Sequence, residues 1–173
     1  MAWPAIEDMD EVTFVQTFGS IYENSPWLAE AVFREGINAD DDNVDGLHRK
    51  LSASLSSAPR DRQLNLIRAH PDLAGKAALA GRVTADSAAE QHSAGLDQCS
   101  PAELEQFENL NAAYLDKFGF PFIIAVKGLS RSGILAIFQQ RLENSPGAEF
   151  DGALRAFIGH IRSRQFDDGR AIR

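Results

Sequence analysis

The stretch "SPAELEQFENLNAAYLDKF" (residues 100–118) carries the local signals of a long α-helix. Ser100 is a favourable N-cap residue, Pro101 suits the first helical position, and Glu103 completes a capping box with Ser100. Its apolar side chains recur every three or four residues and form one stripe: Leu104, Phe107, Leu110, Tyr114 and Phe118. Gly119 and Pro121 then break the helix. The stretch therefore predicts a helix with one face against a core.

The same helical spacing recurs on both sides of this stretch. We expect helices in 10–23, 25–33, 44–55, 58–70, 130–145 and 148–166. In the first of these the expected stripe is Val12, Val15 and Phe18, continued by Ile21 or Tyr22. In the third it is Val44, Leu47, Leu51 and Leu55. Ser25 is a candidate cap for the second helix, with Pro26 at its first position.

No stretch shows sustained strand alternation. The apolar "FGFPFIIAV" (118–126) is the one candidate strand, but Pro121 and the lack of a partner strand favour an extended, buried connector. The sequence thus predicts an all-α fold, a single compact domain over residues 1–173 with about seven to nine helices.

Composition narrows the classes of protein that the sequence allows. The chain has 173 residues, of which 44 % are hydrophobic, which suffices for a sizeable core and excludes a disordered chain. A net charge of −8 argues against a general nucleic-acid binder, which needs a basic face. Cys99 is the single cysteine, so neither an intrachain disulfide nor a four-cysteine zinc site is possible.

We expect a cytoplasmic protein that does not bind membranes. The start "MAWPAIEDMDE" lacks the basic-then-apolar layout of a signal peptide, and the ending "AIR" is not a peroxisomal address. The longest apolar run, "FPFIIAV", is far too short to cross a bilayer.

His70 and Pro71 form the first candidate site. In "LIRAHPDLAG" (66–75) a helix-like run ends at a histidine that a proline follows directly. A residue before proline is pushed away from the helical region, so the His70 ring can project differently from the helical side chains before it. This placement suits a chemical role, and it also suits a histidine that interacts with the helix dipole.

Ser87, Glu90 and Gln91 in "TADSAAEQHSAG" (84–95) form the second candidate site. Their spacing places all three on one face of a helix. A hydroxyl, a carboxylate and an amide suit a ligand rich in N–H and C=O groups. Ser-x-x-Glu is equally a capping box, which taken alone is the commoner meaning.

The segment "KFGFPFIIAVKG" (117–128) is the third candidate site. Its helix breakers leave backbone N–H and C=O groups without helical partners inside an apolar run. Buried backbone groups must be paired, either with other protein groups in an ordinary core connector or with a ligand.

The remaining histidines and arginines suggest no further site. His48, His92 and His160 have no zinc-ligand spacing with His70, so we predict no metal site. We expect the arginines on solvated faces or in ion pairs: Arg131, Arg141, Arg155, Arg162, Arg164 and Arg170. The chain contains neither a Gly-rich phosphate loop nor a Gly-x-Ser-x-Gly elbow.

Taken as a set, the motifs resemble those of a known family. "AHPDLAGK", "SAAEQHSAGL", "LNAAYLDKFGFPFIIAVKG" and "ILAIFQQRLENS" follow in an order and spacing that resemble the 2-oxo-4-hydroxy-4-carboxy-5-ureidoimidazoline (OHCU) decarboxylases. The resemblance runs over nearly the whole chain. It implies an all-helical fold, a homodimer, a small-molecule substrate and no metal or organic cofactor. It also implies a reaction that completes the breakdown of urate to (S)-allantoin.

The resemblance also implies roles for individual residues. It makes His70 the catalytic acid/base and Pro71 its neighbour in the pocket wall. A carboxylate close to His70, for which we take Glu90, would fix the tautomer of the ring, or Glu90 would instead accept N–H bonds from the ureido group of the substrate. The polar part of the substrate site would be Ser87, Ala88, Ala89, Glu90 and Gln91. The segment whose backbone meets the substrate would be Phe122, Ile123, Ile124, Ala125 and Val126.

An arginine of the last helix should also enter the site, and here the chain departs from the family. The family usually has Arg-Leu at this point, whereas this chain has "HIRSRQF" (160–166). Spacing from "RLENS" favours Arg164, while Arg162 follows Ile161 in a local context closer to that of the family. We take Arg164 as the substrate-binding arginine and Arg162 as the alternative.

Two rival classes remain from the residues alone. One is a non-catalytic helical module that binds a ligand or a protein, in which Ser87 and Glu90 only cap a helix. The other is a hydrolase with a histidine-bound metal. A binding module leaves its ligand unchanged, and a metallohydrolase loses activity to a chelator.

Overall fold

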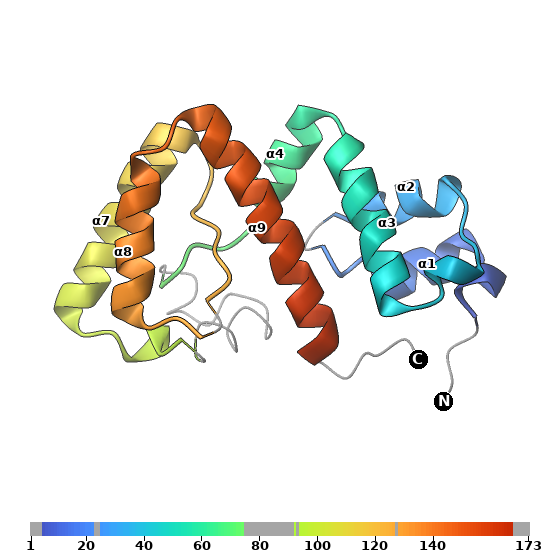
Figure 1. Cartoon of the computed structure of the whole chain (residues 1–173), viewed down its shortest axis with the longest axis horizontal. Coiled ribbons are helices and arrows are strands. Elements are labelled where there is room, and N and C mark those ends of the chain that lie inside the picture. The colour runs from blue at the N-terminus through green and yellow to red at the C-terminus, as the bar shows by residue number, and fades with distance from the viewer. Residues whose placement is uncertain (1–4, 23–24, 75–91, 93, 127, 168–173) are drawn as a thin grey trace. The chain divides into compact units, whose positions relative to one another are not determined.

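The protein is all-α. The computed structural model describes residues 5–22, 25–74, 92, 94–126 and 128–167, with side chains up to Gly159. These residues form seven α-helices, three short 3-10 helices and no strand (Figure 1). The predicted all-α class is confirmed. The seven α-helices of the described ranges agree with the prediction of about seven to nine helices.

Six of the seven described α-helices begin and end within three residues of the predicted positions, whereas the first ends at Phe18, five residues before its predicted end. The α-helices are α1 (Glu11–Phe18), α2 (Pro26–Arg34), α3 (Val44–Ser57), α4 (Arg60–Arg68), α7 (Pro101–Phe118), α8 (Arg131–Leu142) and α9 (Pro146–Asp167). The 3-10 helices are η1 (Ile6–Asp8), η2 (Ala39–Asp41) and η3 (Leu96–Gln98). The chain divides into two compact units, one of residues 1–69 and 158–173 and the other of residues 70–157.

In the first unit α1, α2 and α3 bury their apolar faces together. The predicted stripe of α3 is confirmed, since Val44, Leu47, Leu51 and Leu55 are all buried. The predicted stripe of α1 is wrong in part, because Val12 is 64 % exposed and Phe14 is fully buried. Phe14 and Phe18 lie one turn apart with ring centroids 4.8 Å from each other. The two large rings decide which face of α1 turns inward, and the smaller Val12 is left outside.

Tyr22 is buried just beyond the end of α1. Burial is the main cause that raises the pKa of its phenol to about 12, and a hydrogen bond with Ser52 opposes it only partly. The tyrosine is therefore neutral in the folded protein up to strongly alkaline pH.

Two predicted helix caps can be compared. The capping box of α7 is confirmed: the Ser100 hydroxyl accepts from the Glu103 N–H at 3.2 Å, and the Glu103 carboxylate accepts from the Ser100 N–H at 2.8 Å. Ser25 does occupy the N-cap of α2, with Pro26 following, but its hydroxyl makes no capping hydrogen bond.

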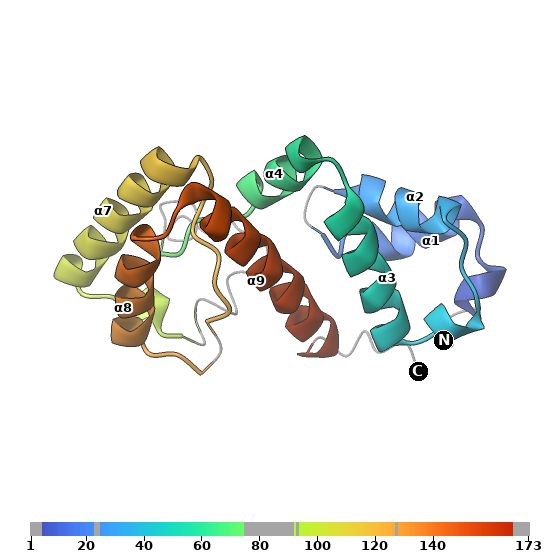
Figure 2. The same ribbon diagram turned by 45° about the horizontal axis from the view of Figure 1, so that its top comes forward.

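In the second unit α7 and α8 lie side by side, as Figures 1 and 2 both show. The connector between them is confirmed as extended and buried, with Phe120, Phe122 and Ile123 at most 2 % exposed. The Phe122 ring stacks on the Phe138 ring of α8 with centroids 3.8 Å apart. The connector is thus fixed by aromatic packing rather than by strand pairing.

Candidate active site

His70 lies where α4 has just ended. The helix ends at Arg68, Ala69 is its C-cap, and the half-buried His70 follows immediately before Pro71. The His70 ring meets the Phe157 ring of α9 edge-on, with centroids 5.6 Å apart and planes at 86°. Its Nδ1 atom is buried. Because Phe157 is only 2 % exposed, the imidazole packs against a fixed part of the core.

The segment that follows His70 is hydrogen-bonded to α7. Leu73 and Ala74 are buried, and the Asn111 side-chain amide donates to the Leu73 carbonyl at 2.9 Å. Ala74 has a positive φ of 49°, which is costly for a residue with a Cβ. Desolvation raises the pKa of the Asp72 carboxyl above its ordinary value.

Asn111 was not predicted, although the sequence contains a signal for it. It lies four residues after Phe107 and three before Tyr114, both fully buried. A polar residue at an inward position of an amphipathic helix needs a buried partner. The Leu73 carbonyl is that partner.

The second predicted motif lies outside the described residues: Ser87, Ala88, Ala89, Glu90 and Gln91. The chain that follows it is described from Ala94 onward. Arg131, the first residue of α8, donates to the carbonyls of Gly95 at 3.0 Å and Gln98 at 3.2 Å. The same guanidinium pairs with the Glu103 carboxylate at 3.1 Å.

The third predicted segment, residues 117–128, is described except for residue 127. Phe122, Ile123 and Val126 are buried, Ile124 is half-buried and Ala125 is exposed. The Arg141 guanidinium of α8 donates to the Ile123 carbonyl at 2.7 Å, and its central carbon lies 4.6 Å from the centroid of the Phe122 ring. One arginine therefore contacts both the ring and the backbone of this segment.

Arg141 belongs to a buried polar cluster. Its Nε and Nη2 atoms lie 2.7 Å and 2.5 Å from Oε1 of Glu149, a residue of α9 that is only 1 % exposed. Asn144 donates to the other carboxylate oxygen at 2.7 Å, and the Tyr114 hydroxyl of α7 donates to Oε1. Burial, and then the hydrogen bond with Glu149, raises the pKa of Tyr114 far above its ordinary value.

The prediction for Arg141 is correct in part. Arg141 is ion-paired, one of the two states expected for it, but its side chain is only 16 % exposed rather than solvated. Sequence alone did not indicate this burial, because its partners Ile123 and Tyr114 come from segments 18 and 27 residues away.

Both candidate arginines of the last helix lie within α9, since that helix extends to Asp167. The side chains of Arg162 and Arg164 lie outside the described part. Phe150 and Phe157 are buried on α9, seven residues apart, and Arg164 comes seven residues after Phe157. The choice of Arg164 stays a prediction.

The described residues contain neither a candidate metal centre nor a candidate membrane span. Within the described ranges no three His, Cys, Asp or Glu side chains gather into a group that could hold a metal ion. None of the helices described there is both long enough and apolar enough to cross a membrane.

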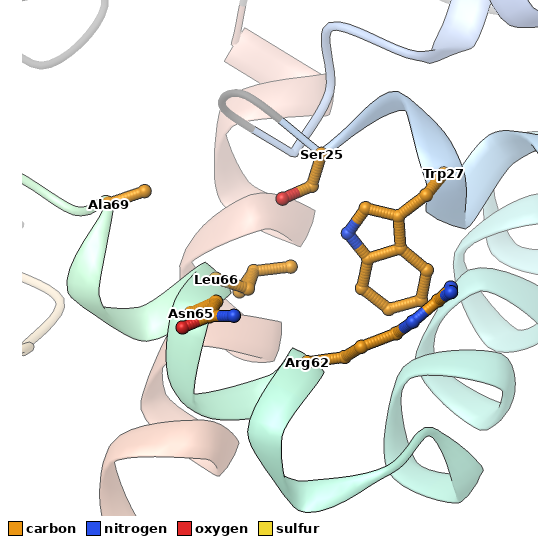
Figure 3. Close-up of a pocket in the computed structure, with 6 residues that line it drawn as sticks. All are labelled: Ser25, Trp27, Arg62, Asn65, Leu66 and Ala69. Carbon is orange, nitrogen blue, oxygen red and sulfur yellow. The ribbon is translucent and has the colours of Figure 1, made fainter.

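A hollow of about 330 Å³ lies in the first unit. Its walls come from α2 and α4 and the residues next to them: Ser25, Trp27, Arg62, Asn65, Leu66 and Ala69 (Figure 3). The Arg62 guanidinium lies 5.2 Å from the centroid of the Trp27 ring. None of these residues was a predicted site residue.

Known proteins match this chain over most of its length. The model of the OHCU decarboxylase family matches residues 7–164. A 2-oxo-4-hydroxy-4-carboxy-5-ureidoimidazoline decarboxylase of Halalkalicoccus jeotgali is 40 % identical over 152 residues, which cover 86 % of this chain and 82 % of that protein. The uric acid degradation bifunctional protein of Bacillus subtilis is 40 % identical over 162 residues, which cover 94 % of this chain and 31 % of that longer protein.

A solved structure agrees with these relatives. The crystal structure of an (S)-allantoin synthase matches with a TM-score of 0.71 at 28 % identity, and the match covers 93 % of this chain and 51 % of that chain. This chain thus spans about half the length of that protein. The sequence match and the shared helical fold lead to one conclusion: the chain belongs to the OHCU decarboxylase family.

Proposed function

We propose that this protein is a decarboxylase that converts 2-oxo-4-hydroxy-4-carboxy-5-ureidoimidazoline to (S)-allantoin and CO2 in urate degradation. The observation that carries the proposal is the match of the family model over residues 7–164. The motif segments of the chain, from "AHPDLAGK" to "RLENS", lie inside that range.

The chemistry of the substrate suits the proposed residues. The carbon that loses CO2 carries a hydroxyl and a carboxylate and lies next to an imine-like ring carbon. Loss of CO2 sends the electron pair toward that neighbour, which must then receive a proton from one face. Histidine titrates near neutrality and can supply this proton, so we assign the acid/base role to His70.

Glu90 is the proposed partner of His70. A carboxylate beside an imidazole fixes the tautomer and favours the charged ring. Glu90 has a second possible task, which is to accept N–H bonds from the ureido group. The two tasks differ in their effect on the pH profile of the reaction, so they can be separated experimentally.

The remaining site residues are proposed to bind the substrate. Pro71 is the wall beside His70, and residues 87–91 supply polar contacts. The backbone of residues 122–126 faces the substrate, and the Arg164 guanidinium forms a two-pronged hydrogen bond with the substrate carboxylate. The placement of His70 against Phe157 and the extended course of residues 120–126 are consistent with these roles.

Three further properties belong to the proposal. We infer that the reaction needs no metal or organic cofactor, because the substrate ring itself accepts the electrons. The protein would work as a homodimer, as its family resemblance implies, and in the cytoplasm, as the expectation from its sequence has it. One enzymatic unit would span residues 1–173.

The decisive experiment generates the unstable substrate in place from urate and follows the optical activity of the allantoin by circular dichroism. We expect rapid formation of one enantiomer, and the rate should be the same with and without a chelator. Formation of racemic allantoin at the spontaneous rate would refute the decarboxylase and favour the non-catalytic binding module. Loss of activity to the chelator would favour the metallohydrolase.

A further inference from the structure

Side chains of α7 and α8 donate hydrogen bonds to backbone carbonyls in or near each candidate segment. Asn111 donates to Leu73, three residues after His70, and Arg131 donates to Gly95, four residues after Gln91. Arg141 donates to Ile123, which lies inside the third segment. Arg141 is the more buried of the two arginines and the only one of the three donors that contacts a predicted site residue directly.

We propose that Arg141, held by Glu149, is a positioning residue for the decarboxylation, which orients the peptide group between Ile123 and Ile124 toward the substrate. The proposal rests on the function proposed above. It goes beyond that function because neither Arg141 nor Glu149 belongs to the predicted site.

The cluster around Glu149 fixes the direction of the Arg141 guanidinium. Two of its nitrogens lie on Oε1 of Glu149, and Tyr114 and Asn144 donate to the same carboxylate. The third nitrogen, Nη1, donates to the Ile123 carbonyl at 2.7 Å. A planar guanidinium with Nε hydrogen-bonded to Oε1 and Nη2 ion-paired with the same oxygen has little freedom left, so the position of the Ile123 carbonyl is set as well.

Stability alone does not account for this ion pair. Two buried charges lose their hydration, and a well-packed apolar pair of the same volume is often equally stable or more so. The neighbouring positions Phe122, Phe138 and Phe150 are already apolar and buried, so an apolar pair would suit the surroundings. What the ion pair adds is a defined hydrogen bond to one backbone carbonyl.

The hydrogen bond to the Ile123 carbonyl also fixes the direction of the N–H of Ile124. In a planar trans peptide the C=O of Ile123 and the N–H of Ile124 point in opposite directions. With the carbonyl turned to Arg141, the N–H of Ile124 is turned away from the cluster. Ile124 is half-buried and Ala125 is exposed. Within the described residues this N–H donates to no acceptor. In the proposal, a carboxylate or carbonyl oxygen of the substrate accepts a hydrogen bond from this N–H.

The test uses two variants of the full-length protein. In the Arg141→Met/Glu149→Gln double variant no charge remains buried, and the amide oxygen that replaces the carboxylate can still accept from Tyr114. In Arg141→Lys the charge remains, but a point charge cannot hold Glu149 and the Ile123 carbonyl in one fork. For both we expect KM to rise and kcat/KM to fall roughly 10- to 100-fold, as for a lost hydrogen bond to a charged group.

A matched control comes from the other unit. Lys50 and Asp41 also form a shielded ion pair, with N–O distance 2.9 Å and side chains 19 % and 7 % exposed. Both belong to the unit of residues 1–69 and 158–173, whereas Arg141 and Ile123 belong to the unit of residues 70–157. The Lys50→Met/Asp41→Asn variant should alter the melting temperature and leave KM unchanged. A purely structural loss lowers the fraction of active protein, which reduces apparent kcat without moving KM.

The outcomes separate the two proposals. If the wild-type protein does not accelerate formation of (S)-allantoin, the proposed function fails and the positioning role fails with it. If the wild type is active and Arg141→Lys keeps its KM and kcat, only the positioning role is overturned. This conclusion does not depend on whether the double variant folds. A rise in KM for Arg141→Lys with an unchanged control supports the role.

Discussion

The imidazole of His70 and the ring of Phe157 meet edge to face, with centroids 5.6 Å apart. The two residues are 87 positions apart in the chain, and Phe157 belongs to the buried face of α9. An aromatic pair of this geometry limits the rotation of the imidazole at a position where the backbone has just left a helix. Under the function proposed above, this restriction would direct the proton from His70 to one face of the substrate.

Replacement of His70 by Asn should remove most of the turnover and leave the helices intact. Loss of a general acid/base reduces the rate roughly 10²- to 10⁴-fold. The circular dichroism of allantoin formed from urate measures the rate, and far-ultraviolet circular dichroism measures the helices. Production of one enantiomer by the variant at nearly the wild-type rate would refute the assignment.

Replacement of Glu90 by Gln separates two roles of this carboxylate. If Glu90 stabilises a charged His70, the variant should lose activity and its pH profile should move to lower pH, because the ring loses a stabilising anion. If Ser87 and Glu90 only form a capping box, the variant should lose about 1 kcal/mol of stability or less with unchanged kinetics. Denaturant unfolding and pH–rate curves on the same preparation decide between the two.

Lysine substitutions distinguish Arg164 from Arg162. The two residues are two apart on α9, so their directions differ by about 200°. Arg164→Lys should lower kcat/KM more than Arg162→Lys, because lysine cannot form the two-pronged contact with a carboxylate. The reverse order in kcat/KM would assign the role to Arg162 and disprove the gap-free alignment.

Replacement of Asn111 by Leu removes the hydrogen bond to the Leu73 carbonyl. A buried carbonyl without its donor costs about 1–3 kcal/mol, and the chain beside His70 gains freedom. We therefore expect a lower melting temperature together with a lower kcat. Exposed Leu115 of the same helix provides the control, since Leu115→Asn should change neither quantity. A normal kcat in Asn111→Leu would show that the Leu73 contact serves stability alone.

Local signals predicted the fold well. The Ser100–Glu103 capping box and the Val44–Leu55 stripe depend on residues within a few positions of one another, and both are present. The buried face of α1 was mispredicted because Val12 and Val15 lead to Phe18 in steps of three residues, whereas Phe14 lies four residues before Phe18, and both spacings occur on a helix face. Only packing against α2, where the Phe14 and Phe33 ring centroids lie 5.6 Å apart, selects Phe14.

The sequence indicated the motifs of the candidate site, but it did not indicate the side chains that hydrogen-bond to the backbone of those motifs. His70 and the connector of residues 120–126 are recognisable because proline and glycine interrupt apolar runs. Arg141 and Asn111 depend on backbone carbonyls 18 and 38 residues away, and no local pattern encodes such a pairing. Asn111 alone carried a hint, as a polar residue at an inward position of α7.

The burial of Tyr22 and Tyr114 gives the protein a built-in optical reporter. They are its only two tyrosines, one in each unit, and burial raises the pKa of both phenols, for Tyr22 from 10.0 to about 12. The neutral phenols contribute stability that is complete below pH 10 and is lost as the pH rises above that unfolded value. Between these limits a folded chain keeps both phenols protonated, whereas an unfolded chain forms phenolate. Phenolate absorbance in mild alkali therefore counts opened units directly, without a dye or a label.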